Sequence, residues 1–223
     1  MAAAVTSHPL TAEQVFDDVG PAYEKAFANL EPQAAAVQWV IDQLREMNSA
    51  KCLDIGCGTG RPTCEELANA GHDVLGIDIS GAMVADASKK IPNAKFEKLD
   101  MAEYNPALES FDAITVFFSM IASVTQDQIR ENIRRIYHWL KPGGVFVFAT
   151  VPVAGNNLEI KWMGRPVVVS SLTAEEAVEC IRTTGFKVEY DAVSAFTPHA
   201  VEAGICEKDD VWEEPHVFVY ARK

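Results

Sequence analysis

A glycine-rich turn near residue 56 is the part of the sequence best suited to binding a ligand. The apolar segment Lys51 to Ile55 precedes it, and the turn reads Gly56-Cys57-Gly58-Thr59-Gly60. Glycines allow a tight turn and leave room for a ligand beside the main chain, because they have no Cβ. Pro62 suits the first position of a following helix. This order predicts a nucleotide-like ligand at the end of a parallel sheet, although a tight turn without a ligand would need similar glycines.

The spacing of the glycines separates this turn from a dinucleotide site. A dinucleotide fingerprint has the spacing G-x-G-x-x-G, whereas here the spacing is G-x-G-x-G and Arg61 stands where the third glycine is needed. Asp54 lies two positions before the first glycine. A carboxylate there would repel a pyrophosphate but would help to hold a cationic ammonium group. The turn therefore favours a cationic nucleotide-like ligand over NAD.

A second carboxylate falls where a ribose would need it. Asp78 ends the apolar segment that follows the first helix, 18 residues beyond Gly60. An acidic residue at the end of the second strand generally accepts hydrogen bonds from ribose hydroxyls. The alternative is that Asp78 caps the next helix, a role that Ser80 is equally able to fill. Met83, in the expected helix 81–90, would lie against the ribose or the adenine, or would fill the core.

The residues Leu53 to Gly60 resemble the first motif of class I S-adenosylmethionine-dependent methyltransferases, and the turn Leu140 to Gly144 resembles a later junction of that family. The resemblance extends from about Leu30 to Lys223 and is nearest to the small-metabolite type that acts on quinones. It implies an α/β, Rossmann-like, doubly wound sheet of seven mostly parallel strands with an antiparallel C-terminal strand. The implied cofactor is S-adenosylmethionine, with S-adenosylhomocysteine as its product.

The same resemblance assigns roles to residues at the strand ends. Asp100 and Met101 follow the third expected strand, where the family binds adenine. The end of the strand 111–118 would lie beside the methionine part of the cofactor and the methyl acceptor. The expected cofactor-binding residues are Tyr23, Asp54, Gly56, Cys57, Gly58, Gly60, Asp78, Ile79, Met83, Asp100, Met101 and Phe117. The expected acceptor-binding residues are Tyr23, Phe118, Met120, Trp162 and Met163.

Two helical segments precede the glycine turn, and we expect residues 1–48 to form a helical cover on a single methyltransferase domain of residues 49–223. Residues 11–27 are expected to be helical with a break at Gly20-Pro21, and residues 33–47 form a second expected helix. In the family, an N-terminal helix with a tyrosine closes over the cofactor, which would make Tyr23 part of a lid. The alternative is a helix that covers one edge of the sheet.

The second half of the chain alternates clear elements with one irregular segment. Residues 153–172 have no clear periodicity, and long irregular segments are usually functional. The resemblance implies that this insertion builds the acceptor pocket through Trp162 and Met163, and the alternative is that both residues pack the segment down. Capping boxes at Thr125 and Thr173 predict two helices. Residues 186–196 and 216–221 are expected to form an antiparallel pair at the sheet edge.

The charge, the cysteines and the absence of certain motifs narrow the classes of molecule that the protein is expected to bind. The 223 residues carry a formal net charge of −13, which disfavours nucleic acids and anionic membranes. The absence of an Asn-Pro-Pro-Tyr motif after the fourth expected strand disfavours nucleic-acid and protein-amide acceptors. The five cysteines contain no C-x-x-C pair, so we expect reduced thiols and no metal site. The sequence has no leader-like or membrane-spanning segment, so we expect a cytoplasmic location. The expected oligomeric state is a monomer or a homodimer.

The implied reaction requires the protein mainly to align the methyl group with the acceptor. A sulfonium methyl group is already activated, so a base is needed only where the acceptor must lose a proton. His8 and His199 lie in segments that would reach a pocket, but neither is assigned, and no catalytic residue is named. We expect O- or C-methylation of a small molecule. The alternatives are a cofactor-assisted cyclisation or elimination, a non-catalytic regulatory partner and an NAD-dependent oxidoreductase.

Overall fold

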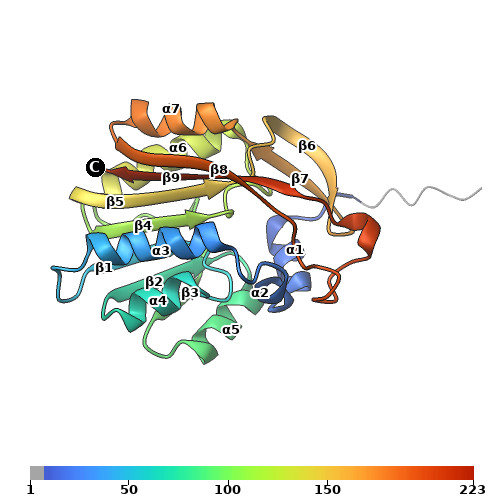
Figure 1. Cartoon of the computed structure of the whole chain (residues 1–223), viewed down its shortest axis with the longest axis horizontal. Helices are drawn as coiled ribbons and strands as arrows, with labels where there is room; N and C mark the ends of the chain where they lie inside the picture. The colour runs from blue at the N-terminus through green and yellow to red at the C-terminus, as the bar shows by residue number, and fades with distance from the viewer. Residues whose placement is uncertain (1–7) are drawn as a thin grey trace, which may run out of the picture.

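A seven-stranded sheet forms the centre of the molecule (Figure 1), in the order β3-β2-β1-β4-β5-β9-β8. The computed structural model describes residues 8–223, so residues 1–7 of the expected cover lie outside the described part. The strands of this sheet are β1 (Lys51–Ile55), β2 (Asp73–Asp78), β3 (Lys95–Lys98), β4 (Phe111–Phe117), β5 (Leu140–Thr150), β8 (Lys187–Phe196) and β9 (Glu214–Arg222). Strand β9 runs antiparallel to both of its neighbours, and the pairs from β3 to β5 are parallel. The expected fold is confirmed.

Seven α-helices in the described part of the chain surround the sheet: α1 (Ala12–Val19), α2 (Ala22–Ala26), α3 (Glu31–Gln43), α4 (Thr63–Asn69), α5 (Gly81–Lys90), α6 (Gln126–Trp139) and α7 (Ala174–Thr184). Capping boxes begin three of them: those at Thr125 and Thr173, which the sequence predicts, and one at Thr11, which was not predicted. Figure 1 shows α6 and α7 on one face of the sheet and α3 and α4 on the other. Helix α3 ends at Gln43, four residues before its expected end.

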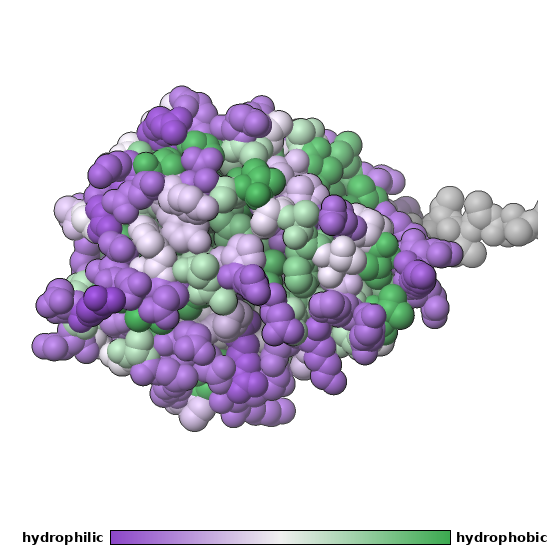
Figure 2. Space-filling model, viewed as in Figure 1, coloured by the Kyte–Doolittle hydropathy of each residue, from purple (hydrophilic) through white to green (hydrophobic). Residues whose placement is uncertain are grey.

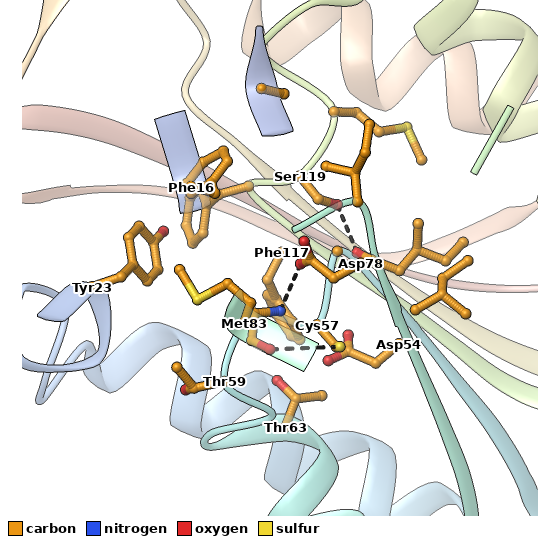
Figure 3. Close-up of a pocket in the computed structure, with 18 of the residues that line it drawn as sticks. Phe16, Tyr23, Asp54, Cys57, Thr59, Thr63, Asp78, Met83, Phe117 and Ser119 are labelled. Atoms are coloured by element: carbon orange, nitrogen blue, oxygen red, sulfur yellow. Dashed lines mark hydrogen bonds between the residues drawn. The ribbon is translucent and has the colours of Figure 1, made fainter. Parts of the chain in front are cut away.

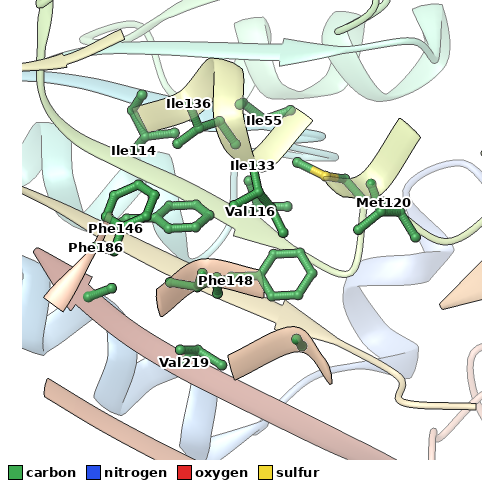
Figure 4. Close-up of a cluster of buried hydrophobic side chains, with 14 of the residues drawn as sticks. Ile55, Ile114, Val116, Met120, Ile133, Ile136, Phe146, Phe148, Phe186 and Val219 are labelled. Carbon is green, nitrogen blue, oxygen red and sulfur yellow. The ribbon is translucent and has the colours of Figure 1, made fainter. Parts of the chain in front are cut away.

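Strand β5 shows why the sheet is buried on both faces. Its side chains alternate, so that Phe146 and Phe148 pack with α6 and α7, and Val145 and Val147 pack with α3 and α4. All four side chains are buried. Figure 4 shows the two phenylalanines among side chains of α6 and β4. A continuous apolar run in a central parallel strand is the expected result of two covered faces.

The segment of residues 153–172 is a β-hairpin, and the expectation of an irregular insertion was wrong. Strands β6 (Gly155–Trp162) and β7 (Arg165–Ser171) pair antiparallel in a separate two-stranded sheet. Met163 and Gly164 connect them with φ of 45° and 82°, the positive values that a two-residue type I′ turn requires. Most side chains of β6 are exposed. Apolar and polar residues nevertheless alternate from Leu158 to Trp162, a strand pattern that the expectation overlooked. The hairpin packs against α1 through Val167 and Val169.

The surface is largely polar. On the face in Figure 2, hydrophilic side chains predominate and apolar ones gather in small patches. Within residues 8–223, none of the helices combines the length and the apolar character needed to cross a bilayer.

Replacing Phe148 by alanine tests the role of the face covered by α6 and α7. Phe148 is 1% exposed, so we expect Phe148→Ala to lower the free energy of unfolding by about 3–5 kcal/mol, because a large cavity forms in a packed core. Urea denaturation measures the change. The control is Leu108→Ala, at a side chain that is 70% exposed, where we expect a change within about 0.5 kcal/mol. Equal effects of the two substitutions would contradict this assignment of the core.

Candidate functional site

A large cavity lies at the carboxyl ends of the parallel strands, below α1 and α2. Its volume is about 1290 Å³, whereas pockets for single small ligands are typically about 300–1,000 Å³. The turns after β1, β2, β3 and β4 all contribute to its lining. Figure 3 shows Phe16 and Tyr23 on one side of the cavity, facing Met83 and the turn residues Cys57 and Thr59. The cavity has room for a nucleotide-sized ligand and a second, smaller molecule.

The three glycines of the first turn have different roles. A Cβ on Gly56 would lie 2.0 Å from the Cβ of Ser119, so the end of β4 packs directly on this glycine. A Cβ on Gly58 would meet nothing within 4 Å, and this glycine lines the cavity with φ of 54°. A Cβ on Gly60 would lie 2.6 Å from Ile91. Gly60 is not among the lining residues of the cavity, and the absence of a side chain there permits close packing behind the turn.

Asp78 connects the first turn to the end of β2. Its Oδ2 accepts a hydrogen bond from the backbone N–H of Gly58 at 2.8 Å, and its Oδ1 accepts one from the N–H of Ser80 at 2.8 Å. Ser80 caps α5, so the helix cap does not require Asp78. Burial raises the pKa of Asp78. A carboxylate has about four acceptor positions, so two remain after these bonds for hydroxyl groups of a ligand.

Asp54 is a buried carboxylate in the cavity lining without a cationic partner among residues 8–223. Its side chain is 3% exposed and accepts hydrogen bonds from Thr115 Oγ1 at 2.7 Å and from Cys64 Sγ at 3.4 Å. Burial raises the pKa of Asp54 from 3.8 to about 6. A cationic group bound in the cavity would lower the free energy of the ionised carboxylate.

Acidic side chains predominate around the cavity. Its lining contains eight acidic residues, Glu13, Glu24, Glu31, Asp54, Glu65, Asp78, Asp100 and Glu131, and three basic ones, Lys25, Arg61 and Arg135. Arg61 pairs with Glu65 at 2.7 Å. Arg135 donates to the backbone carbonyl of Met101 at 3.1 Å. The cavity therefore favours a ligand with positive charge and disfavours an anionic one.

The cover formed by α1 and α2 is attached to α5 and to the end of β3 by polar contacts. Asp17 Oδ1 accepts hydrogen bonds from Ser80 Oγ at 2.6 Å and from the N–H of Ala82 at 3.1 Å. Glu13 pairs with Lys98 at 2.6 Å, and Glu24 pairs with Lys90 at 2.8 Å. These contacts place the aromatic side chains of the cover over the turn after β1.

Most residues that the sequence nominates meet at this cavity. Its lining includes Tyr23, Asp54, Gly56, Cys57, Gly58, Asp78, Ile79, Met83, Asp100, Met101, Phe117, Phe118 and Met120. Sequence reasoning missed two aromatic lining residues of the cover, Phe16 and Phe27. The available signal was their place in the same amphipathic segment as Tyr23.

Trp162 and Met163, which are expected to contact the acceptor, lie outside the cavity lining. The indole of Trp162 packs 5.9 Å from Phe16, ring centre to ring centre, and its Nε1 donates to Glu214 Oε1 at 3.1 Å. Met163 is 2% exposed and packs against Ala26 of the cover. The hairpin turn places both side chains behind the cover, where they support its position.

A sheet of this order with one antiparallel strand, and a cavity over a glycine-rich first turn, define the class I methyltransferase fold. A family model for a methyltransferase domain matches residues 52–144. Demethylmenaquinone methyltransferase of Paenarthrobacter aurescens (strain TC1) is 30% identical over 150 residues, which cover 66% of this chain and 57% of that protein. This chain covers only part of the first curated relatives that it matches, namely 47%, 64% and 45% of their lengths.

Two solved structures share the fold over almost the whole chain. Magnesium protoporphyrin IX methyltransferase from Synechocystis PCC 6803, solved with bound S-adenosylhomocysteine, has a TM-score of 0.68 at 14% identity and covers 95% of this chain and 97% of its own. The cyclase SpnF has a TM-score of 0.64 at 20% identity and covers 95% of each chain. The resemblance to class I S-adenosylmethionine-dependent methyltransferases that the motifs indicate is thus confirmed.

Replacing Asp54 by asparagine should stabilise the ligand-free protein at neutral pH. The pKa of Asp54 is higher in the folded than in the unfolded chain, so the folded chain binds more protons between about pH 4 and pH 6, and stability falls as pH rises through that window. At pH 7 the ionised side chain costs about 3 kcal/mol, since one pKa unit is worth about 1.4 kcal/mol. We expect Asp54→Asn to raise the free energy of unfolding by about 3 kcal/mol at pH 7. At pH 4, where Asp54 is mostly protonated in the folded chain, the gain should be under about 1 kcal/mol.

Urea denaturation at both pH values measures the effect. The control is Asp73→Asn, at an exposed carboxylate of β2 that pairs with Lys95 at 3.1 Å, which should change stability by under about 0.5 kcal/mol at either pH. A gain from Asp54→Asn that is equal at pH 4 and pH 7 would contradict the electrostatic explanation.

Proposed function

We propose that this protein transfers the methyl group of S-adenosylmethionine to a small-molecule acceptor. The observation that carries the proposal is the arrangement of two buried carboxylates about an open glycine. Asp54 has no cationic partner in the described chain, and Asp78 keeps free acceptor positions beside Gly58. Such a cavity fits a ligand with a ribose, an ammonium group and a sulfonium group.

The lining residues divide among the parts of this cofactor. We assign the ribose hydroxyls to Asp78, the ammonium group to Asp54 and the adenine to Asp100 and Met101. Ile79 and Met83 are assigned to the apolar surface of the adenosine, and Gly56, Cys57, Gly58 and Phe117 to the methionine part. When bound, the cofactor supplies a methyl group that is already activated by the sulfonium. The work of the chain is to hold both reactants in line and to exclude water.

The acceptor side of the cavity supports an uncharged, planar acceptor. Phe16, Tyr23, Phe27, Phe118 and Met120 contribute its aromatic and apolar lining. Tyr23 stacks on Phe27 with ring centres 4.4 Å apart. Aromatic walls bind flat apolar molecules well, and the acidic lining disfavours an anionic one. We therefore propose O- or C-methylation of such a molecule. The expected reducing, cytoplasmic location is in keeping with five free cysteines.

We further propose that the cover of residues 1–48 acts as a lid on the domain of residues 49–223 through α1 and α2, while α3 packs in the core of that domain. The lid helices contribute Phe16, Tyr23 and Phe27 to the cavity, so ligands cannot be enclosed without them. The polar contacts of Asp17 and Glu13 with the sheet side are at the surface, where single contacts are weak. Opening for exchange of cofactor and product would break these polar contacts of the cover with α5 and β3.

A cofactor-assisted cyclisation is the second candidate, because a cyclase shares the fold. The two functions differ in their products. Methyl transfer converts each molecule of S-adenosylmethionine into S-adenosylhomocysteine, whereas a cyclisation leaves the cofactor unchanged. Chromatography of the cofactor after turnover separates them. A regulatory partner without catalysis would leave both cofactor and acceptor unchanged.

Calorimetric titration tests the cofactor assignment. We expect S-adenosylmethionine and S-adenosylhomocysteine to bind, and NADH not to bind. Asp78→Ala should weaken binding by about two orders of magnitude, because hydrogen bonds to a charged group are worth about 1.5–3 kcal/mol each. The control is Asp73→Ala at the other end of the same strand, which should bind as the wild type does. Binding of NADH alone, or equal binding by the two variants, would contradict the proposal.

A further inference from the structure

A buried pair of polar side chains on β9 has no place in the function described so far. Glu214 is 6% exposed and His216 is 0% exposed. The two side chains lie on the same face of the strand, and His216 Nε2 is 3.3 Å from Glu214 Oε2. The other carboxylate oxygen accepts the hydrogen bond from Trp162 Nε1 at 3.1 Å. Glu214 is therefore held on both oxygens, and it holds the imidazole in turn.

The second ring nitrogen of His216 is buried without a partner. No hydrogen bond reaches Nδ1 from the described part of the chain. A carboxylate only accepts hydrogen bonds, so Nε2 carries the proton of the neutral ring and Nδ1 presents a free lone pair. Ser194 lies opposite His216 in the β8–β9 register, and its Oγ is also buried and unpartnered. Buried polar atoms are nearly always hydrogen-bonded, so an exception of this kind indicates a missing partner.

His216 lies directly behind the aromatic wall of the acceptor side. Its ring centre is 4.5 Å from that of Phe118, which lines the cavity. It is 6.0 Å from that of Phe196, which stacks 5.9 Å from the lining residue Phe27. Phe118 has φ of 57°, a left-handed conformation that is costly for a bulky residue and that concentrates at functional sites. The ring of Phe118 thus contacts both the imidazole of His216 and the cavity.

We propose that His216, oriented by Glu214, is the base that takes the proton of a hydroxyl acceptor, which enters beside Phe118. This inference rests on the proposed methyl transfer and narrows it to O-methylation of an uncharged aromatic alcohol. The acceptor O–H bond breaks and its proton passes to Nδ1, while the oxygen forms a bond to the methyl carbon. The carbon–sulfur bond breaks with its electron pair on sulfur, which leaves a neutral thioether. Glu214 stabilises the imidazolium that results.

The proposed step requires a neutral His216 whose Nδ1 accepts the proton. Within residues 8–223, the titratable group in contact with this imidazole is Glu214 from its own strand, and Tyr23 of α2 lies near Glu214. Burial, and secondly the charge of Glu214, raises the pKa of Tyr23, so the phenol stays protonated and does not compete as a base. Trp162 from β6, Phe118 from the end of β4, and Ser194 and Phe196 from β8 carry no charge.

Nitrogen NMR tests the contact in the wild-type protein. The protein is labelled with ¹⁵N-histidine, saturated with S-adenosylhomocysteine and titrated with phenol, catechol and 2-naphthol, each matched by its fully methylated ether. We expect at least one alcohol to shift the Nδ1 resonance of His216, assigned by its loss in His216→Asn, and its ether to leave that resonance unchanged. No shift with any alcohol, or equal shifts with alcohols and ethers, would overturn the proposal.

Kinetics with the alcohol that shifts Nδ1 supply the second test. His216→Asn should lower kcat about 10²–10⁴-fold at pH 7 and leave the affinity for S-adenosylmethionine unchanged. The deficit should shrink at alkaline pH, where the acceptor ionises without a base. The control is His199→Asn, at an exposed histidine, which should behave as wild type. A loss that is equal at every pH would assign His216 a structural role only. Absence of S-adenosylmethionine binding to the wild type would instead refute the proposed function.

Discussion

The hydrogen bond from the backbone N–H of Gly58 to Asp78 is the contact on which the cofactor half of the site depends. It joins the turn after β1 to the end of β2, so two turns that belong to different strands form one surface. The same carboxylate also holds the N–H of Ser80, where α5 begins, and the cover bonds to that residue through Asp17. The turn, the second strand, the α5 helix and the cover therefore have fixed relative positions through one buried side chain and its nearest neighbours.

This arrangement favours ligand binding at the expense of stability in the empty protein. Asp54 and Asp78 are both buried, and burial raises the pKa of each. Two ionised groups in an apolar cavity also repel each other. A cationic ligand removes this cost, so part of the binding free energy comes from relief of a penalty that the folded chain already carries. Functional sites commonly reduce stability in this way.

Local signals explain why so much of the fold and of the cofactor half could be predicted from the sequence. The glycine spacing, the position of Asp78 after the second strand and the capping box at Thr125 each depend on residues a few positions apart. The ends of parallel strands lie at one edge of a sheet, so their order along the chain is enough to bring Asp54, Asp78 and Asp100 together. The hairpin at 155–171 was missed although apolar and polar residues alternate from Leu158 to Trp162, because this alternation is short and most positions of β6 are exposed.

The acceptor half could not be predicted to the same extent, because its wall is assembled from residues far apart in the chain. Phe27 comes from the cover, Phe118 from the end of β4 and Phe196 from β8. No spacing rule connects these positions, and only the pairing of β9 with both β5 and β8 brings them side by side. The same pairing places His216 behind that wall, in a strand whose sequence looks like ordinary edge-of-sheet packing. A polar side chain in such a strand is informative only once the structure shows that one of its nitrogen atoms lacks a partner.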